Sequence, residues 1–383
     1  MNCRAEETAK SCRAEVSQLC SHANPETPHG TPVMRTYKRK GIYINNRTVM
    51  GMIWLFLIMV GGRGCGKTFT TQNYLLRRFR KSGRPCIWLR LKEPSCRKLL
   101  ANNARGFFDT KLFDKWKLYD RKIEVKGNSI YIDDKEFCRI AAISTFYSDK
   151  GLAGMNSQRS VNSAAAKSAI TKLAKKYDTI VCDEFNMERS EKRTFDVTYA
   201  FVNQLETICR FDTDRRIILL GNTLEEASDI LAECFGFIPD NPGIYKLKNK
   251  KAVIWSIEDS KEYQEARAAS IAGMLAPEES TFTNETQTDR DLLTTKPIGK
   301  QTQIIRFAGN KYFVLCGDVV TCQKPSDTTS IPTIAMRPYI AGYPYYKDRV
   351  KNVIEAAQQR RLKFDKLITL KLFYKEIKLL QGG

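Results

Sequence analysis

Residues 61–68 constrain the fold of this chain more than any other feature. They read Gly-Gly-Arg-Gly-Cys-Gly-Lys-Thr and match the pattern G-x-x-x-x-G-K-S/T. Glycines let successive backbone N–H groups curl around a phosphate, and a helix N-terminus adds its positive dipole. An apolar run precedes the motif and a helical pattern follows it, which predicts a phosphate-binding loop between a buried strand and a helix. The predicted nucleotide-binding residues are Gly61, Gly62, Arg63, Gly64, Cys65, Gly66, Lys67 and Thr68.

A second motif supplies the acids that such a loop needs. Lys67 is expected to reach the β- and γ-phosphates of ATP, and the Thr68 hydroxyl to ligate Mg²⁺. The mostly apolar residues 179–182 end in Asp183 and Glu184. Asp183 at the strand tip is then a second Mg²⁺ ligand, and Glu184 is the base that polarises the attacking water. The alternative is an acidic strand end that solvent covers, but the pairing with the loop predicts hydrolysis.

A third strand, residues 217–220, is followed by Gly221 and Asn222. Asn222 can orient the water or sense the γ-phosphate, although an Asn is also a common turn residue. A strand with an acid followed by a strand with Asn is the order of the additional-strand, catalytic-glutamate class of P-loop ATPases, which are mostly ring motors on polymers.

Arg210 lies between a helix and this strand. It could complete a neighbouring subunit's site or be a solvated surface arginine.

From residue 52 onward strand and helix patterns alternate, which predicts an α/β fold with a parallel sheet. The expected strands of this part are 52–60, 86–91, a hairpin of 123–125 and 129–132, 179–182, 216–220 and 253–257, and the expected helices are 68–81, 197–209 and 266–276. Later strands at 303–307 and 312–316 and helices at 346–359 and 364–380 predict a small α+β domain.

The 383 residues suggest two or three domains. We expect an N-terminal arm (1–48), an ATPase domain (49–262), a linker (263–300) and a basic C-terminal domain (301–383). The arm holds Cys3, Cys12, Cys20 and His22, whose spacing matches no familiar zinc site.

The longest apolar run, 49–60, is shorter than the ~20 residues of a membrane span. No signal peptide is expected, and twelve scattered cysteines suit reduced thiols in a cytoplasm.

The balance of charge points to a polyanionic partner. Lys and Arg number 63 and Asp and Glu 42, so the formal net charge is +21. Residues 301–383 contribute 14 basic and 6 acidic side chains, a net charge of +8. Such an excess predicts binding to nucleic acid or to an acidic membrane surface, and the chain offers no apolar span for the second.

Together these motifs resemble the double-stranded DNA packaging ATPases of small short-tailed phages with protein-primed linear genomes, compact relatives of the terminase large subunit. The resemblance rests on the loop 61–68 with Arg63 inside it, Ile-Trp-Leu-Arg at 87–90, the hairpin strand 129–132, Asp-Glu-Phe at 183–185, Glu-Thr-Ile-Cys-Arg at 206–210 and Arg-Leu-Lys-Phe-Asp at 361–365. It covers about residues 52–383, most strongly through the ATPase half.

The resemblance implies a homopentameric ring that works in the host cytoplasm, transiently at the portal (connector) vertex of an empty capsid, and drives the double-stranded genome inward. Lys67, Asp183 and Glu184 take the hydrolytic roles, and Arg210 falls on the trans-acting arginine of the family. Lys150 falls near a second basic residue that acts across the subunit interface. The C-terminal domain is implied to be a vestigial RNase H-like nuclease, and a structural packaging RNA joins the candidate partners.

Two regions depart from the family pattern: the arm 1–48 is longer, and residues 151–176 form an Ala/Ser/Lys-rich insertion. The insertion is either a DNA-facing basic loop or a solvated helix. We expect no nuclease activity, because two-metal hydrolysis needs three or four converging carboxylates. Only Asp318 clearly follows a strand among the candidates Asp318, Asp327, Asp348, Glu355, Asp365 and Glu376.

The sequence therefore predicts an ATP-driven translocase of double-stranded DNA that grips phosphates rather than bases. Two other functions fit the same motifs. One is another ring motor, such as a helicase or a conjugative DNA pump, which a strand-separation assay distinguishes. The other is a nucleic-acid-binding scaffold at the portal that uses ATP as an assembly switch, which predicts binding with negligible turnover.

Overall fold

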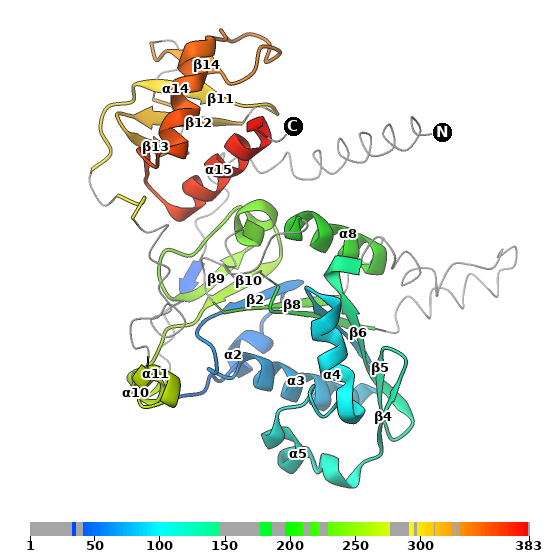
Figure 1. The fold of residues 1–383 in the computed structure, drawn as a ribbon. Helices are drawn as coiled ribbons and strands as arrows, with labels where there is room; N and C mark the ends of the chain where they lie inside the picture. Colours follow the sequence, from blue (N-terminus) through cyan, green and yellow to red (C-terminus); the bar gives the residue numbers. More distant parts are fainter. Residues whose placement is uncertain are drawn as a thin grey trace, which may run out of the picture. The chain divides into compact units, whose positions relative to one another are not determined.

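The computed structural model describes residues 33–35, 41–145, 177–185, 196–209, 215–222, 229–275, 291–294, 297–309, 311–323, 325–326 and 330–381. These residues divide into two compact units (Figure 1). The larger unit takes its described residues from 31–227 and 241–285, and the smaller unit from 228–240 and 286–383. The smaller unit is thus discontinuous in sequence.

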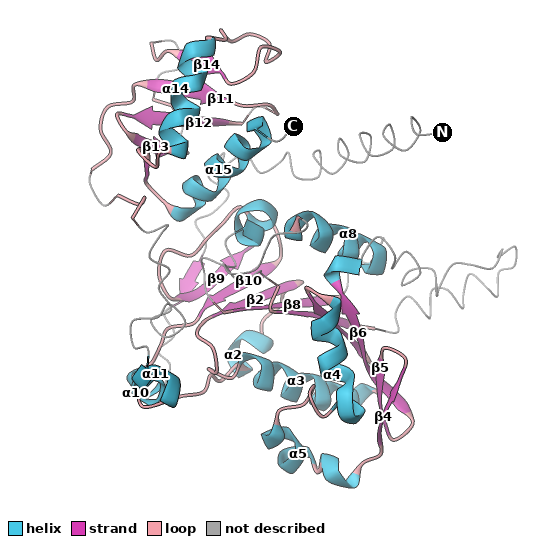
Figure 2. Cartoon of the chain, in the orientation of Figure 1, coloured by secondary structure: helices cyan, strands magenta, loops and turns pink. Residues whose placement is uncertain are grey.

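A large sheet, drawn in magenta in Figure 2, forms the centre of the larger unit. It has ten strands in the order β1-β9-β10-β2-β8-β7-β3-β6-β5-β4. The strands from β10 to β6 are parallel, and the strands at both edges are antiparallel. In chain order the strands are β1 (Val33–Arg35), β2 (Phe56–Val60), β3 (Cys86–Arg90), β4 (Ile123–Lys126), β5 (Ser129–Ile132), β6 (Lys135–Ala142), β7 (Thr179–Asp183), β8 (Arg216–Gly221), β9 (Gly243–Leu247) and β10 (Ala252–Ser256).

Helices cover both faces of this sheet, and α3 and α8 lie on opposite faces (Figure 1). Leu75 and Leu76 of α3 pack into the core cluster that also holds Leu57 and Trp88 of the sheet. The helical elements are α2 (Arg47–Met50), α3 (Lys67–Ser82), α4 (Glu93–Ala104), α5 (Thr110–Trp116), η1 (Leu118–Asp120), η2 (Ile143–Thr145), α8 (Val197–Cys209), α10 (Lys261–Ala268) and α11 (Ile271–Leu275). Coverage of both faces explains why the central strands are almost continuously apolar.

The expected strand 52–60 is wrong in its first half, since β2 begins at Phe56. The Trp54 indole N–H donates to the Val49 carbonyl at 2.8 Å, which turns the chain before the sheet, and Ile53 is fully exposed. The expected single helix 266–276 is also wrong. Ser260 and Ser270 each accept a hydrogen bond from a backbone N–H three residues later, so two helices, α10 and α11, begin there instead.

Part of the expected arm 1–48 belongs to the large sheet. Val33–Arg35 forms β1 and pairs antiparallel with β9, and the Ile44 N–H donates to the Cys65 carbonyl at 3.0 Å. Ile44 and Asn46 are both buried. Residues 33–35 and 41–55 therefore form part of the larger unit.

The smaller unit is built on a five-stranded sheet in the order β14-β11-β12-β13-β15. Its strands and helices are η3 (Leu231–Phe235), β11 (Gln303–Arg306), β12 (Tyr312–Cys316), β13 (Val319–Thr321), β14 (Thr333–Ala335), α14 (Lys347–Gln358), β15 (Lys363–Phe364) and α15 (Leu367–Gln381). Phe313, Phe364 and Phe373 are at the centre of its core. Glu233 of η3 forms an ion pair with Lys375 of α15, so residues 229–240 pack on the last helix.

Within the described residues, no helix has both the length and the apolar character that crossing a membrane requires.

Candidate nucleotide site

The loop between β2 and α3 has the conformation that its sequence predicts. Gly66 caps α3 with φ of 93°, a left-handed conformation that favours glycine. A Cβ on Gly61 would lie 2.7 Å from the Cβ of Ile257, so only glycine fits beside the end of β10. The Lys67 ammonium is buried and donates to the Gly61 and Gly62 carbonyls at 2.7 and 2.9 Å. It thus spans the mouth of the loop, where phosphate is expected.

The sheet brings the second motif beside this loop. β8 lies between β2 and β7, with Gly221 opposite Val60 and Leu220 opposite Asp183. The carboxyl ends of all three strands therefore share one edge. The Thr68 hydroxyl lies 3.5 Å from Asp183 Oδ1. Threonine and aspartate oxygens are ligands that Mg²⁺ prefers, and this pair is close enough to share one ion.

Burial dominates the chemistry of Asp183. Its side chain is only 4% exposed, and this burial raises the pKa of the carboxyl to about 6, against the opposing effect of the Arg90 guanidinium. The Arg90 guanidinium lies 3.1 Å from Oδ2, yet that oxygen accepts no hydrogen bond. A buried carboxylate oxygen without a hydrogen bond fits a site that a cation completes. In the part of the chain that is described, no three His, Cys, Asp or Glu side chains gather as metal ligands, so phosphate and water would supply the rest.

Glu184 follows in an unusual backbone conformation. Its φ is 51°, a left-handed value that is uncommon for a non-glycine residue, and its N–H donates to the Leu220 carbonyl at 3.0 Å. This turn directs Glu184 away from the path of the strand, and its side chain is 58% exposed. The carboxylate forms an ion pair with Arg90. Glu184 is therefore reachable by water and held by a guanidinium.

Asn222 directly follows β8 and is half-buried. It lies at the carboxyl end of β8, the strand between β2 with its loop and β7 with its acids. Lys150 and Arg210, the two residues expected to act in trans, lie outside the described residues.

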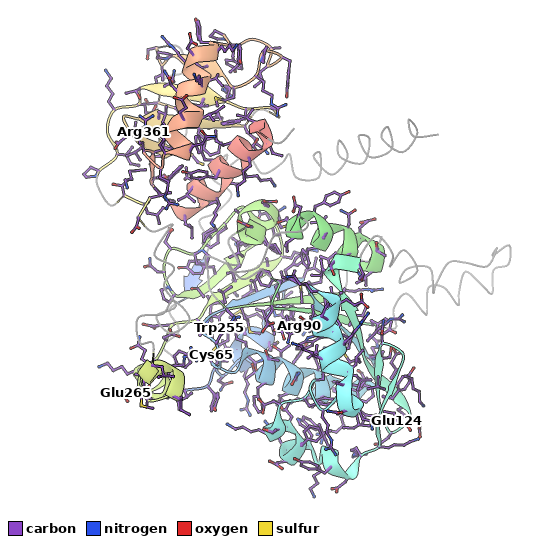
Figure 3. The ribbon with its side chains drawn as sticks, in the orientation of Figure 1. Cys65, Arg90, Glu124, Trp255, Glu265 and Arg361 are labelled. Carbon is purple, nitrogen blue, oxygen red and sulfur yellow. The ribbon has the colours of Figure 1, made fainter. Side chains whose placement is uncertain are left out.

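Arg90 and Tyr263 are site residues whose roles sequence analysis missed. Arg90 ends β3, the strand next to β7, and contacts both Asp183 and Glu184; Figure 3 labels it together with Cys65 of the loop. Tyr263 of α10 is buried and its hydroxyl donates to the Arg63 carbonyl at 2.6 Å. The sequence places Tyr263 in the expected linker, whereas the structure uses it to hold the loop. A polar residue at a strand's carboxyl end was the available signal for Arg90.

A cavity of about 620 Å³ runs along α3, with lining residues from Phe69 near its start to Lys81 in its last turn. Its lining includes Phe69 and Thr70, which follow the loop directly, and Asn46 from the segment before α2. Asn46 is 9% exposed and its amide nitrogen is buried without a hydrogen-bond partner. The remaining lining is Ile44, Asn45, Arg47, Met50, Gly51, Asn73, Tyr74, Arg77, Arg78, Lys81 and Lys115, which contains no carboxylate.

Comparison with known proteins identifies the family of this chain. The family model of the podovirus DNA encapsidation protein (Gp16) matches residues 38–294. The chain belongs to this family. The packaging family expected from the motifs is thereby confirmed.

Individual relatives are also DNA packaging proteins, and each matches a smaller share of this chain than the family model does. A DNA packaging protein of Bacillus phage B103 is 25% identical over 62% of this chain and 66% of its own length. The DNA packaging protein of Bacillus phage phi29 is 24% identical over 62% of each chain. The match thus spans less than two thirds of these relatives. A solved structure of the bacteriophage Phi-29 viral genome packaging motor assembly has a TM-score of 0.59 and 18% identity, covering 89% of this chain and 100% of that one, which shows a shared fold.

Proposed function

We propose that this chain is an ATPase that drives double-stranded DNA into a preformed capsid. The observation that carries the proposal is the convergence of Lys67, Asp183 and Glu184 at the carboxyl edge of three adjacent strands, with Thr68 3.5 Å from Asp183. Family membership supplies the substrate class, and the net charge of +21 supports a polyanionic track.

We assign the larger unit to the additional-strand, catalytic-glutamate class. The support is the sheet order β2-β8-β7, in which one strand stands between the phosphate-loop strand and the acid-bearing strand. In this assignment Glu184 accepts the proton of the attacking water, and Asn222 orients that water. Lys67 moves from the loop carbonyls to the phosphates, and Arg90 holds both acids in place.

Thr68 and Asp183 would hold Mg²⁺ together with phosphate oxygens. A bound Mg²⁺ neutralises charge that develops on the phosphates. Ionised Asp183 is required for this, and Arg90 favours the ionised form.

The cavity beside α3 is proposed to hold the base and sugar of the nucleotide. Phe69 and Thr70 continue directly from the phosphate loop into its lining. The Asn46 amide nitrogen has no hydrogen-bond partner, and a side-chain amide carries a donor and an acceptor side by side, the pair that adenine's ring edge complements. This supports ATP as the nucleotide.

The assembly is proposed from the family and the resemblance. The chain would form a homopentameric ring at the portal vertex in the host cytoplasm, with a structural packaging RNA as a further partner and with Arg210 and Lys150 reaching the neighbouring subunit's site. The smaller unit would be a nuclease-like domain without cleavage activity. Its antiparallel β11-β12-β13 meander, extended by parallel β14, supports an RNase H-like origin, although β15 pairs with β13 rather than with β14.

Steady-state ATP hydrolysis by the full chain, with and without linear double-stranded DNA, tests the proposal. We expect DNA to stimulate turnover and Glu184→Gln to reduce it by about 100-fold or more, as loss of a general base does. Glu265→Gln, a change of an exposed residue of α10 that Figure 3 labels, is the matched control and should keep full turnover. An ATP turnover rate that changes neither with DNA nor with Glu184→Gln would refute the proposed motor. Separation of the two strands of a DNA duplex would identify a helicase instead.

A further inference from the structure

The segment from Arg337 to Arg349 in the smaller unit presents an unusual concentration of exposed tyrosines. Tyr339, Tyr343, Tyr345 and Tyr346 are 64, 37, 38 and 50% exposed. We call these four residues, with Arg306, Arg337 and Arg349, the tyrosine surface. Exposed aromatic rings gathered in one short segment mark interaction sites more often than chance placement does.

This segment is held in place rather than hanging freely. The Ala335 N–H of β14 donates to the Pro344 carbonyl at 2.9 Å, and the Met336 N–H donates to the Arg306 carbonyl at 2.9 Å. Arg337 donates to the Leu379 carbonyl of α15 at 2.6 Å, and Val350 begins the hydrogen bonds of α14 by donating to Tyr346. The rings are therefore presented by a fixed loop, and binding would require little ordering.

Each of three arginines lies against a ring of the tyrosine surface. The Arg306 guanidinium carbon is 4.8 Å from the centre of the Tyr343 ring and 4.9 Å from that of Tyr312. Arg349 lies 5.1 Å from the ring of Tyr346, and Arg337 5.7 Å from that of Tyr339. Three of the four exposed rings thus each have a guanidinium group against them.

The charge favours a polyanion. Asp348 is the only acid between residues 337 and 349, and residues 301–383 carry a net charge of +8. A protein partner would need a strongly acidic face to match. A nucleic acid matches both the positive charge and the exposed rings, because phosphates pair with arginine while bases stack on aromatic rings.

We propose that the tyrosine surface binds unpaired nucleotides of a nucleic acid strand, with bases stacked on the tyrosines and phosphates beside the arginines. The bases of a duplex are stacked on each other and offer no free face, so a duplex could use only the cations. The surface is therefore specific for single-stranded segments of DNA or RNA. This site is separate from the nucleotide site and does not depend on the proposed translocase activity.

Equilibrium binding of labelled oligonucleotides to the full chain, without ATP, tests the proposal. The probes are oligodeoxythymidine, oligouridine and a mixed-sequence duplex, each of about 20 nucleotides, which is enough to cross a small site. The test variant is Tyr339→Leu/Tyr346→Leu, and Tyr339→Phe/Tyr346→Phe keeps the rings without the hydroxyls. Tyr119→Leu is the matched control, because Tyr119 is 69% exposed and lies in the larger unit.

Loss of two stacking rings should weaken single-strand binding by about 25-fold or more, since one base–ring stack contributes a factor of about 5 to about 150. The Phe variant and Tyr119→Leu should bind like the parent chain, and duplex binding should change by less than about 2-fold. Arg349→Gln should lower the slope of log Kd against log salt by about 0.7, the value for one phosphate of a single strand.

The two single-strand probes distinguish RNA from DNA. Tighter binding of oligouridine would identify RNA as the occupant, and tighter binding of oligodeoxythymidine would identify DNA. Unchanged single-strand binding by the Leu variant would overturn the proposal. An equal loss for duplex and single strand would also overturn it, because stacking would not then be the interaction. Circular dichroism of each variant checks that the smaller unit is folded.

Discussion

The Asp183 carboxyl is buried, yet the proposed role as a Mg²⁺ ligand requires its ionised form. With the side chain 4% exposed, the cost of burying a charge outweighs the attraction of Arg90, and the pKa rises from 3.8 to about 6. The raised pKa makes the nucleotide-free site a source of instability at neutral pH. A site that binds a cation tolerates this cost because the bound ion offsets it.

Removing this charge should therefore stabilise the chain in the absence of nucleotide and metal. Because the folded-state pKa lies above the unfolded one, the folded chain holds the Asp183 proton more tightly. Stability therefore falls as pH rises from about 4 to about 6. Asp183→Asn should raise the free energy of unfolding by about 3 kcal/mol at about pH 8 and leave it nearly unchanged at about pH 4. Denaturant titrations at both pH values measure this, and an equal gain at both would exclude the ionisation as its cause.

Asn46 should determine the choice of base. In Asn46→Leu we expect the preference for ATP over GTP to fall by about 10-fold or more, because a paired amide–adenine contact contributes about 1–3 kcal/mol. Affinity measurements with both nucleotides separate this effect from general damage. A similar loss of affinity for ATP and for GTP would mean that the base does not contact Asn46.

At the level of elements, the ion pair between Glu233 of η3 and Lys375 of α15 joins two segments that are far apart in sequence. Glu233 is only 18% exposed, so a lysine there would face Lys375 in a partly dry setting. Glu233→Lys should lower the thermal stability of the full chain and expose η3 to proteolysis. The double exchange Glu233→Lys/Lys375→Glu should restore both. No rescue would mean that the two residues do not stabilise each other.

The elements that could be predicted from the sequence are those with one clear periodicity. β7, β8 and α8 agree with prediction to within one residue, because continuous apolar runs and a long helical pattern leave little choice. β6 and β9 were missed, since each mixes Lys or Arg into an apolar pattern, and each stands where the parallel part of the sheet meets an antiparallel strand. The contacts of Arg90 with Asp183 and Glu184 could not be predicted, because they depend on which strands become neighbours. Asn46 was hidden in a segment that composition marks as an arm.

For the whole molecule, the net charge of +21 should dominate duplex binding. A surface that grips phosphates releases counterions, so affinity for double-stranded DNA should fall by about 10³-fold between about 50 and about 200 mM salt if about six phosphates are contacted. Two duplexes of unrelated sequence should bind equally well. Filter binding across salt concentrations measures both, and a marked preference for one sequence would indicate base contacts.

The discontinuity of the smaller unit bears on how the chain is made. Residues 229–240 leave the ribosome before β9 and β10, yet their partner α15 begins more than a hundred residues after β10. The larger unit can complete its sheet once β10 has emerged, whereas η3 must wait for more than a hundred further residues. During that interval the apolar side of η3, with Leu231 and Phe235, has no permanent partner. Vectorial synthesis thus makes this short helix the segment on which chaperone binding during translation is expected to concentrate.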